Sequence, residues 1–289
     1  MNEIVVGIDG SDNSLAAVDW AAEEASRRNT ALRIVYAIAP WVSDTPVGAR
    51  IGVVHEWLLG GAQPITDRSI TRARDRAPEV RVSGDTTDGQ AAAALIDEAR
   101  GAVMLVVGSR GMGGLAGMLA GSVALQVVSH ARCPTVVVRR EEHPPQGEVV
   151  LGVDGSSSCA AAVSFAFEEA ALRKARLRAV LAWPHPVSTE PGDMQPLAYD
   201  PEIVTKEEER TLHETIAGWQ EEFPDVEVVH EVLHARPAKA LAGASARADL
   251  LVVGSRGRGG FAGLMLGSVS HAMLHHSHCP VAVVPPQIG

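Results

Sequence analysis

Aromatic residues, basic charge and long apolar runs are all scarce in this chain of 289 residues. Aromatic side chains make up only 4% of it, which suits an aromatic-rich binding surface badly. The net charge is −10, so the chain lacks the positive surface of a general nucleic-acid or anionic-membrane binder. No apolar run approaches the ~20 residues that cross a bilayer, and no signal-like segment opens the chain. We therefore expect a cytoplasmic protein that binds neither nucleic acid nor membrane.

Cysteine is also rare. Cys133, Cys159 and Cys279 are odd in number and far apart, which argues against a disulfide framework and a CxxC metal or redox pair. Cys133 and Cys279 each precede a proline at the start of an apolar run. This position favours a buried structural thiol over a redox sensor.

Glycine, by contrast, is abundant with 28 residues, and an internal repeat shows where it is concentrated. The sequence VGIDGS at 6–11 returns as LGVDGS at 151–156, and VVGSRGMGGLAGMLAGSV at 106–123 returns as VVGSRGRGGFAGLMLGSV at 252–269. An offset of 145 to 146 residues is far longer than a solenoid repeat, so it indicates a duplicated domain. We predict two domains, 1–140 and 147–289, joined through the charged, proline-bearing segment 139–147.

Short apolar runs alternate with helical patterns in both halves, which predicts an α/β fold of two tandem doubly wound domains with parallel sheets. The expected strands are 4–8, 32–38, 80–82, 103–107 and 135–138, then 149–153, 177–182, 226–229, 250–253 and 281–284. The proline-bearing segments 40–64 and 184–201 are expected to be loops. The charge run 206–210 is interpreted as the solvated face of a helix whose inner side carries Leu212, Ile216 and Trp219.

A glycine loop with the spacing G-x2-G-x9-G-S follows the fourth expected strand of each half. Ligands of doubly wound sheets bind at the carboxyl ends of the strands, and residues without Cβ let backbone N–H groups converge on phosphate oxygens. Ser122 and Ser268 begin the next helix, where unpaired amides and the helix dipole attract an anion. Arg110 and Arg256 would add positive charge.

The loop belongs to neither of two common phosphate-binding classes. No Gly-Lys-Ser/Thr occurs, so it is not a P-loop, and it follows the fourth strand where a Rossmann fingerprint follows the first. The plain alternative is a tightly turned glycine loop with no ligand. Two copies with the same spacing, each accompanied by a GxDGS turn, favour a phosphate site over that alternative.

Together, the GxDGS turns, the loop spacing and the Cys-Pro before each last strand resemble the universal stress protein family, in its nucleotide-binding branch. The resemblance covers nearly the whole chain, which is similar to tandem members from mycobacteria. It implies a five-stranded parallel sheet of strand order 3-2-1-4-5 in each domain, with helices on both faces. It also implies ATP as the cofactor, one per domain, with Mg or Mn as an accompanying ion.

The resemblance also implies which residues hold ATP, and no protein metal ligands are among them. Asp9 and Asp154 would lie on the adenosine side, although N-capping of the first helix is an alternative role for Asp9. Ala37 and Ala182 would offer backbone groups to the adenine. The implied set is Gly7, Asp9, Ala37, Gly108, Ser109, Arg110, Gly111, Met112, Gly113, Gly114, Gly121, Ser122 and Val123, then Gly152, Asp154, Ala182, Gly254, Ser255, Arg256, Gly257, Arg258, Gly259, Gly260, Gly267, Ser268 and Val269.

The two loops differ at a few positions. Met112 is replaced by Arg258, and Leu115 by Phe261. The second site is therefore predicted to be more basic and to bind a polyphosphate more tightly.

Histidines crowd one segment of the second half. His271 and His275 have the i, i+4 spacing that places two imidazoles on one helix face, but the first half has Leu125 and Ser129 there and no acidic ligand lies nearby. A solvated helix end is favoured over a metal site.

We predict an ATP-binding stress-response protein that acts as a sensor or regulator rather than a fast enzyme. The alternative is a slow ATPase or an adenylating enzyme of the adenine-nucleotide α-hydrolase-like group, and a third reading is a ligand-free interaction module. The chain has no Walker lysine and no SGGxDS-type loop after its first strand, which argues against rapid catalysis. The last strands of such domains commonly pair in the family, so we expect a pseudo-dimer of the two halves and a homodimer of chains.

Overall fold

A computed structural model describes residues 3–38, 50–111, 120–139, 145–184, 200–258 and 266–286, with only the helical backbone for 50–59. The chain divides into two compact units. Unit 1 comprises Met1–Glu142 and Pro280–Pro285, and unit 2 comprises His143–Cys279 and Pro286–Gly289. In the described parts, no helix combines the length and the apolar character that a membrane span requires.

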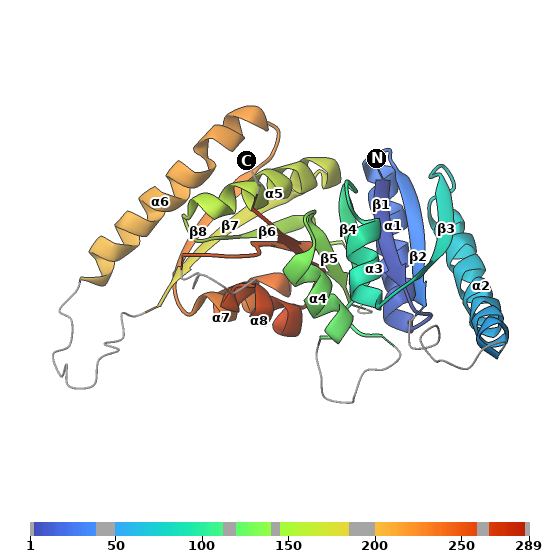
Figure 1. Ribbon diagram of the computed structural model, residues 1–289. Coiled ribbons are helices and arrows are strands. Elements are labelled where there is room, and N and C mark those ends of the chain that lie inside the picture. The colour runs from blue at the N-terminus through green and yellow to red at the C-terminus, as the bar shows by residue number, and fades with distance from the viewer. Residues whose placement is uncertain are drawn as a thin grey trace, which may run out of the picture. The chain divides into compact units, whose positions relative to one another are not determined.

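Unit 1 is a sheet with helices on both faces (Figure 1). Its parallel strands lie in the order β3-β2-β1-β4-β5, which confirms the predicted order 3-2-1-4-5 for the first half. The elements are β1 (Glu3–Ile8), α1 (Asp12–Arg27), β2 (Ala31–Ile38), α2 (Arg50–Arg76), β3 (Val82–Asp88), α3 (Ala91–Glu98), β4 (Met104–Gly108), α4 (Ser122–His130) and β5 (Thr135–Val138).

Unit 2 repeats this plan, with parallel strands in the order β8-β7-β6-β9. Its elements are β6 (Glu148–Val153), the 3-10 turn Ser157–Cys159, α5 (Ala160–Arg173), β7 (Arg176–Trp183), α6 (Pro201–Glu222), β8 (Val228–His234), α7 (Pro237–Ser245), β9 (Leu250–Gly254) and α8 (Ser268–His276). The last strand, β10 (Val281–Val284), is grouped with unit 1 and pairs antiparallel with β5 there.

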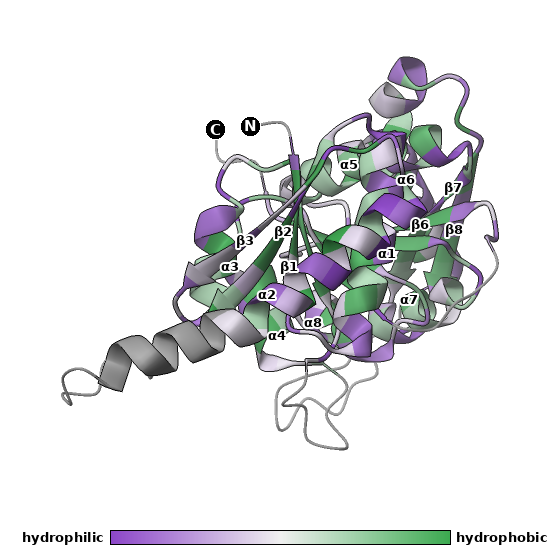
Figure 2. Cartoon of the chain, turned by 90° about the vertical axis from the view of Figure 1, so that its right-hand side faces the viewer, coloured by the Kyte–Doolittle hydropathy of each residue, from purple (hydrophilic) through white to green (hydrophobic). Residues whose placement is uncertain are grey.

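The core lies along the central strands. Ile4, Val5 and Val6 of β1 and Leu105 and Val106 of β4 have no exposed surface, because helices cover both faces of these strands. Figure 2 shows the same pattern as hydrophobic colour along β1 and β2 and hydrophilic colour on the outer side of α1. Continuous apolar runs of this kind are typical of parallel strands, which are buried on both faces.

Helix α2 corrects the prediction of a loop at 40–64, since residues 50–64 are helical and Pro64 lies inside the helix. Its buried face is made of small residues, Ala62, Thr66, Ser69 and Ala73, which carry little hydrophobic signal. The Thr66 hydroxyl donates to the Ala62 carbonyl at 3.1 Å and the Ser69 hydroxyl to the Ile65 carbonyl at 2.8 Å. The hydroxyl groups thus find hydrogen-bond acceptors within the helix, which allows these polar side chains to be buried.

The predicted positions of the two outermost strands, β3 and β8, were also wrong. The runs 80–82 and 226–229 predicted short strands, whereas β3 spans Val82–Asp88 and β8 spans Val228–His234. Both strands are only partly buried along their length, so polar residues occupy them and the apolar pattern fades. In α6 the predicted inner side is confirmed for Leu212 and Ile216, which are completely buried, while Trp219 is half-buried.

Candidate functional site

In unit 1, the turn after β1 and the glycine loop after β4 meet at the carboxyl ends of the two neighbouring strands. Asp9 Oδ1 accepts a hydrogen bond from the Ser11 backbone N–H at 3.0 Å. Its other oxygen, Oδ2, lies where a Cβ on Gly111 would collide with it. Ser11 Oγ donates to the Arg110 carbonyl at 3.4 Å. The two segments that the sequence singled out are therefore in direct contact.

Unit 2 shows the same contact in more detail. Asp154 Oδ1 accepts from the Ser156 N–H at 3.0 Å and from Ser156 Oγ at 2.7 Å. Asp154 Oδ2 accepts from the Arg258 backbone N–H at 2.7 Å, and a Cβ on Gly257 would lie 2.6 Å from it. The carboxylate thus ties the turn after β6 to the glycine loop, and only glycine leaves room for it at position 257.

The N-cap of α1 is Ser11, which excludes the alternative capping role for Asp9. Ser11 Oγ accepts from the Ser14 backbone N–H at 3.2 Å, while Asp9 lies three residues before the first helical residue. A hydroxyl in this position satisfies one of the helix's unpaired N–H groups. The Asp9 carboxylate is therefore directed to the turn and the loop.

Three of the predicted ligand-lining glycines are explained by packing within the protein. A Cβ on Gly7 would lie 2.6 Å from Leu95 Cδ1 of α3, and one on Gly152 would lie 2.9 Å from Leu241 Cδ1 of α7. A Cβ on Gly108 would lie 2.7 Å from the carbonyl carbon of Asn13, in the first turn of α1. At Gly108 the neighbouring atoms are backbone, so the packing of α1 already requires glycine there without a ligand. At Gly7 and Gly152 the neighbours are the ends of leucine side chains, which can move, so packing favours glycine less strictly.

The ends of each glycine loop are closed by hydrogen bonds. Gly121, the N-cap of α4, donates its N–H to the Ser109 carbonyl at 2.7 Å, and Gly267, the N-cap of α8, donates to the Ser255 carbonyl at 2.7 Å. The Ser109 N–H donates to Val138 of β5 at 2.7 Å. The backbone of Ser109 therefore holds the loop in place, and its predicted contact with the ligand stays a prediction.

Both helices after the loops begin without a side-chain cap. Ser122 and Val123 are the first residues of α4, and Ser268 and Val269 are the first of α8. The first N–H groups of a helix have no partner inside it and carry the positive end of the dipole. These amides are therefore an anion-attracting feature at the end of each loop.

The predicted adenine contacts lie at the same strand ends. The last pair between β1 and β2 is Ile8 with Tyr36, and Ala37 is one residue beyond it. In unit 2 the last pair is Val153 with Leu181, and Ala182 is one residue beyond it.

Five of the predicted residues lie outside the described part of the chain: Met112, Gly113, Gly114, Gly259 and Gly260.

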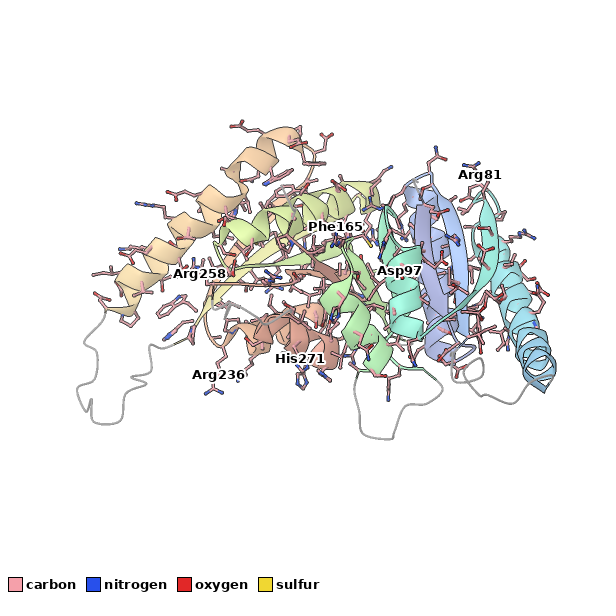
Figure 3. The ribbon with its side chains drawn as sticks, in the orientation of Figure 1. Arg81, Asp97, Phe165, Arg236, Arg258 and His271 are labelled. Atoms are coloured by element: carbon pink, nitrogen blue, oxygen red, sulfur yellow. The ribbon has the colours of Figure 1, made fainter. Side chains whose placement is uncertain are left out.

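Arg258 makes an ion pair that the sequence prediction missed. Its guanidinium Nη1 lies 3.0 Å from Glu208 Oε1 of α6 (Figure 3 labels Arg258). Glu208 belongs to the run interpreted as a solvated face, yet only 17% of its side chain is exposed. The carboxylate offsets the extra charge that was expected to make the second site more basic. The one signal in the sequence is that both residues change between the repeats, from Ala62 to Glu208 and from Met112 to Arg258, which does not by itself place them in contact.

The residues that the structure describes contain no group of three or more histidine, cysteine or acidic side chains placed to hold a metal. The rings of His271 and His275 have their centroids 4.8 Å apart, tilted by 49°. All three cysteines are buried.

Burial raises the pKa of the Cys133 and Cys159 thiols to about 11 and that of Cys279 to about 12. With pKa values this high, roughly a thousandth or less of each thiol is ionised at pH 8, and the thiolate is the form that reacts. We expect native protein to react with a disulfide reagent at pH 8 far more slowly than protein unfolded in urea, which should titrate all three thiols. Rapid reaction of one thiol in the folded protein would contradict the prediction.

Comparisons with known proteins agree with the resemblance. The model of the universal stress protein family matches residues 1–139 and again 147–285. The universal stress protein Rv1996 of Mycobacterium tuberculosis is 38% identical over 308 residues, covering 97% of this chain and 94% of that protein. A universal stress protein of Mycolicibacterium smegmatis is 37% identical over 290 residues, covering 98% and 97%. The crystal structure of a universal stress protein from Archaeoglobus fulgidus covers 98% of both chains with a TM-score of 0.71 at 19% identity, which supports the fold.

Proposed function

Since the chain belongs to the universal stress protein family, we propose that it binds one ATP in each of its two halves and acts as a sensor or regulator whose state depends on the bound nucleotide. The observation that carries the proposal is the contact between an aspartate and a glycine loop, made in both units by Asp9 with Gly111 and by Asp154 with Gly257. This contact assembles a carboxylate, a glycine-rich loop and a helix N-terminus at one end of the sheet.

Each part of the site suits a different part of ATP. Asp9 or Asp154 would accept from ribose hydroxyls, and the backbone at Ala37 or Ala182 would face the adenine. The phosphates would lie at the uncapped starts of α4 and α8, where amides and the dipole offset their charge. A protein with a net charge of −10 needs such local donors, because its surface repels an anion on average. Mg²⁺ or Mn²⁺ would offset further phosphate charge, with an aspartate holding the ion through water.

The arrangement favours binding over turnover. In unit 2, Asp154 contacts the loop and already accepts hydrogen bonds from Ser156 and Arg258. A carboxylate held in this way is a poor general base, since proton abstraction would disrupt the contacts that shape the loop. We therefore propose at most weak ATPase activity, and no fast phosphoryl or adenylyl transfer.

Calorimetric titration of the nucleotide-free protein with ATP tests the proposal. We expect two binding events per chain, and an Asp9→Ala/Asp154→Ala variant should lose both, because its loops lose their anchor. Steady-state ADP release, measured on the same samples, separates a regulator from an enzyme. Multiple turnovers per minute that the double variant abolishes would favour the slow ATPase instead, and absence of any binding by wild type would reject both.

A further inference from the structure

Unit 2 contains a charged contact at its loop that has no counterpart in unit 1. Arg258 Nη1 lies 3.0 Å from Glu208 Oε1 and 3.3 Å from Oε2, and Nη2 lies 3.3 Å from Oε2. Both guanidinium nitrogens therefore donate to the carboxylate. Such a two-pronged pair has a defined geometry as well as a favourable energy. Glu208 lies on α6, away from the loop in sequence, and therefore fixes where the Arg258 side chain lies.

The pair lies directly over the turn that follows β6. A Cβ on Gly155, whose φ is +71°, would collide with Arg258 Nη2 and with Thr211 of α6. The backbone N–H of the same arginine is bonded to Asp154. Arg258 thus spans the two segments that form the proposed site, with its amide on the aspartate and its guanidinium turned back toward α6.

Unit 1 shows what the site is like without the pair. There the residue over the turn glycine is Ile65, whose Cδ1 would lie 3.2 Å from a Cβ on Gly10. Ile65 and Thr211 occupy equivalent positions, with an offset of 146 residues. By the same offset, Glu208 corresponds to Ala62, which is buried, and Arg258 corresponds to Met112. Both members of the pair are thus present in one half and both absent from the other.

We propose that Glu208 is an affinity-determining residue of the unit 2 nucleotide site, an inference that rests on the proposed function. It acts as an internal anion that competes for Arg258, so a polyphosphate binds only by drawing the guanidinium away from the carboxylate. The phosphates then also meet the negative charge of Glu208, which like-charge repulsion makes unfavourable. In unit 1 the equivalent residues, Ala62 and Met112, are uncharged, so the two sites of one chain respond to different ATP concentrations.

The test measures ATP and adenosine affinity by titration in a Gly111→Asp background, which leaves only the unit 2 site intact. Glu208→Gln removes the competing charge and keeps the shape of the side chain. We expect it to tighten ATP binding by roughly three- to tenfold, the scale of a partly exposed ion pair together with a relieved repulsion. Adenosine, which has no phosphate, should bind with unchanged affinity.

Two further variants separate the contact from general effects of charge. Glu209→Gln removes the same charge from the neighbouring, exposed position of α6 and should leave ATP affinity close to that of the parent. Arg258→Met should weaken ATP binding, because Glu208 then remains without its cation. Adding Glu208→Ala to Arg258→Met recreates the residues of unit 1 and should recover affinity.

Unchanged or weaker ATP binding by Glu208→Gln would overturn the inference, since it would mean that Glu208 holds Arg258 in place for the phosphates. An equal gain for adenosine, or the same gain in Glu209→Gln, would overturn it as well. If wild type binds both ligands and only these comparisons fail, the proposed function stands. If wild type binds neither ligand, both proposals fall.

Discussion

A Gly111→Asp/Gly257→Asp variant is expected to fold normally and to lose ATP binding by about a hundredfold or more, since a like charge placed against a buried or liganded one costs several kcal/mol. At position 111 the new Cβ would collide with Asp9 Oδ2, and at 257 it would lie 2.6 Å from Asp154 Oδ2. Either the loop or the aspartate must move, and a second carboxylate then repels the phosphates. Calorimetry with ATP measures the loss, and circular dichroism on heating checks that the fold is retained.

The matched control adds the same two charges elsewhere. Gly60 of α2 and Gly218 of α6 are exposed helical glycines, and a Cβ on either would meet no atom within 4 Å. A Gly60→Asp/Gly218→Asp variant should bind ATP like wild type, because a side chain added at either exposed position meets neither aspartate nor the described loop residues. Wild-type affinity in the Gly111→Asp/Gly257→Asp variant would remove the glycine loops from the site.

Gly108→Ala is expected to lower the free energy of unfolding by about 2 kcal/mol, the usual cost of forcing an extra methyl group into a packed interior. The new Cβ would lie 2.7 Å from the Asn13 carbonyl carbon and 2.9 Å from the Ser14 nitrogen. These are backbone atoms in the first turn of α1, which cannot rotate away as the end of a side chain can. Urea unfolding followed by circular dichroism measures the change.

Gly254→Ala is the matched control, because Gly254 holds the equivalent position at the end of β9. The nearest atom to its Cβ would be the Arg256 carbonyl oxygen at 3.1 Å, in the loop itself and not in a packed helix. We expect a clearly smaller loss of stability there. Equal losses in the two variants would show that the packing of α1 against β4 is not what requires glycine at 108.

The sequence predicted the parts of the molecule that depend on local patterns. Buried runs such as Ile4–Val6 and Leu105–Val106 read as strands, because parallel strands covered on both faces are continuously apolar. The repeat placed the GxDGS turn and the glycine loop in both halves, and the sheet order then brought Asp9 to Gly111 and Asp154 to Gly257. These contacts follow once β1 and β4 are known to be neighbours.

What the sequence did not disclose depends on contacts between distant segments. Gly108 and Gly111 look alike in the motif, yet the first is required by the backbone of α1 and the second by the Asp9 carboxylate. Glu208 resembled any acid on a solvated helix until the fold placed Arg258 beside it. Helix α2 was missed because Pro64 reads as a helix breaker and its buried face carries small, partly hydroxylated residues.

The proposed function depends most on the binding of an adenine nucleotide by each half of the chain. The most direct test is to denature purified wild-type protein and to identify the released small molecules by chromatography and mass spectrometry. The account predicts an adenine nucleotide in amounts approaching one per unit in the presence of ATP, and none from the Gly111→Asp/Gly257→Asp variant. Wild-type protein that releases no adenine nucleotide, even after incubation with ATP and rapid desalting, would contradict it.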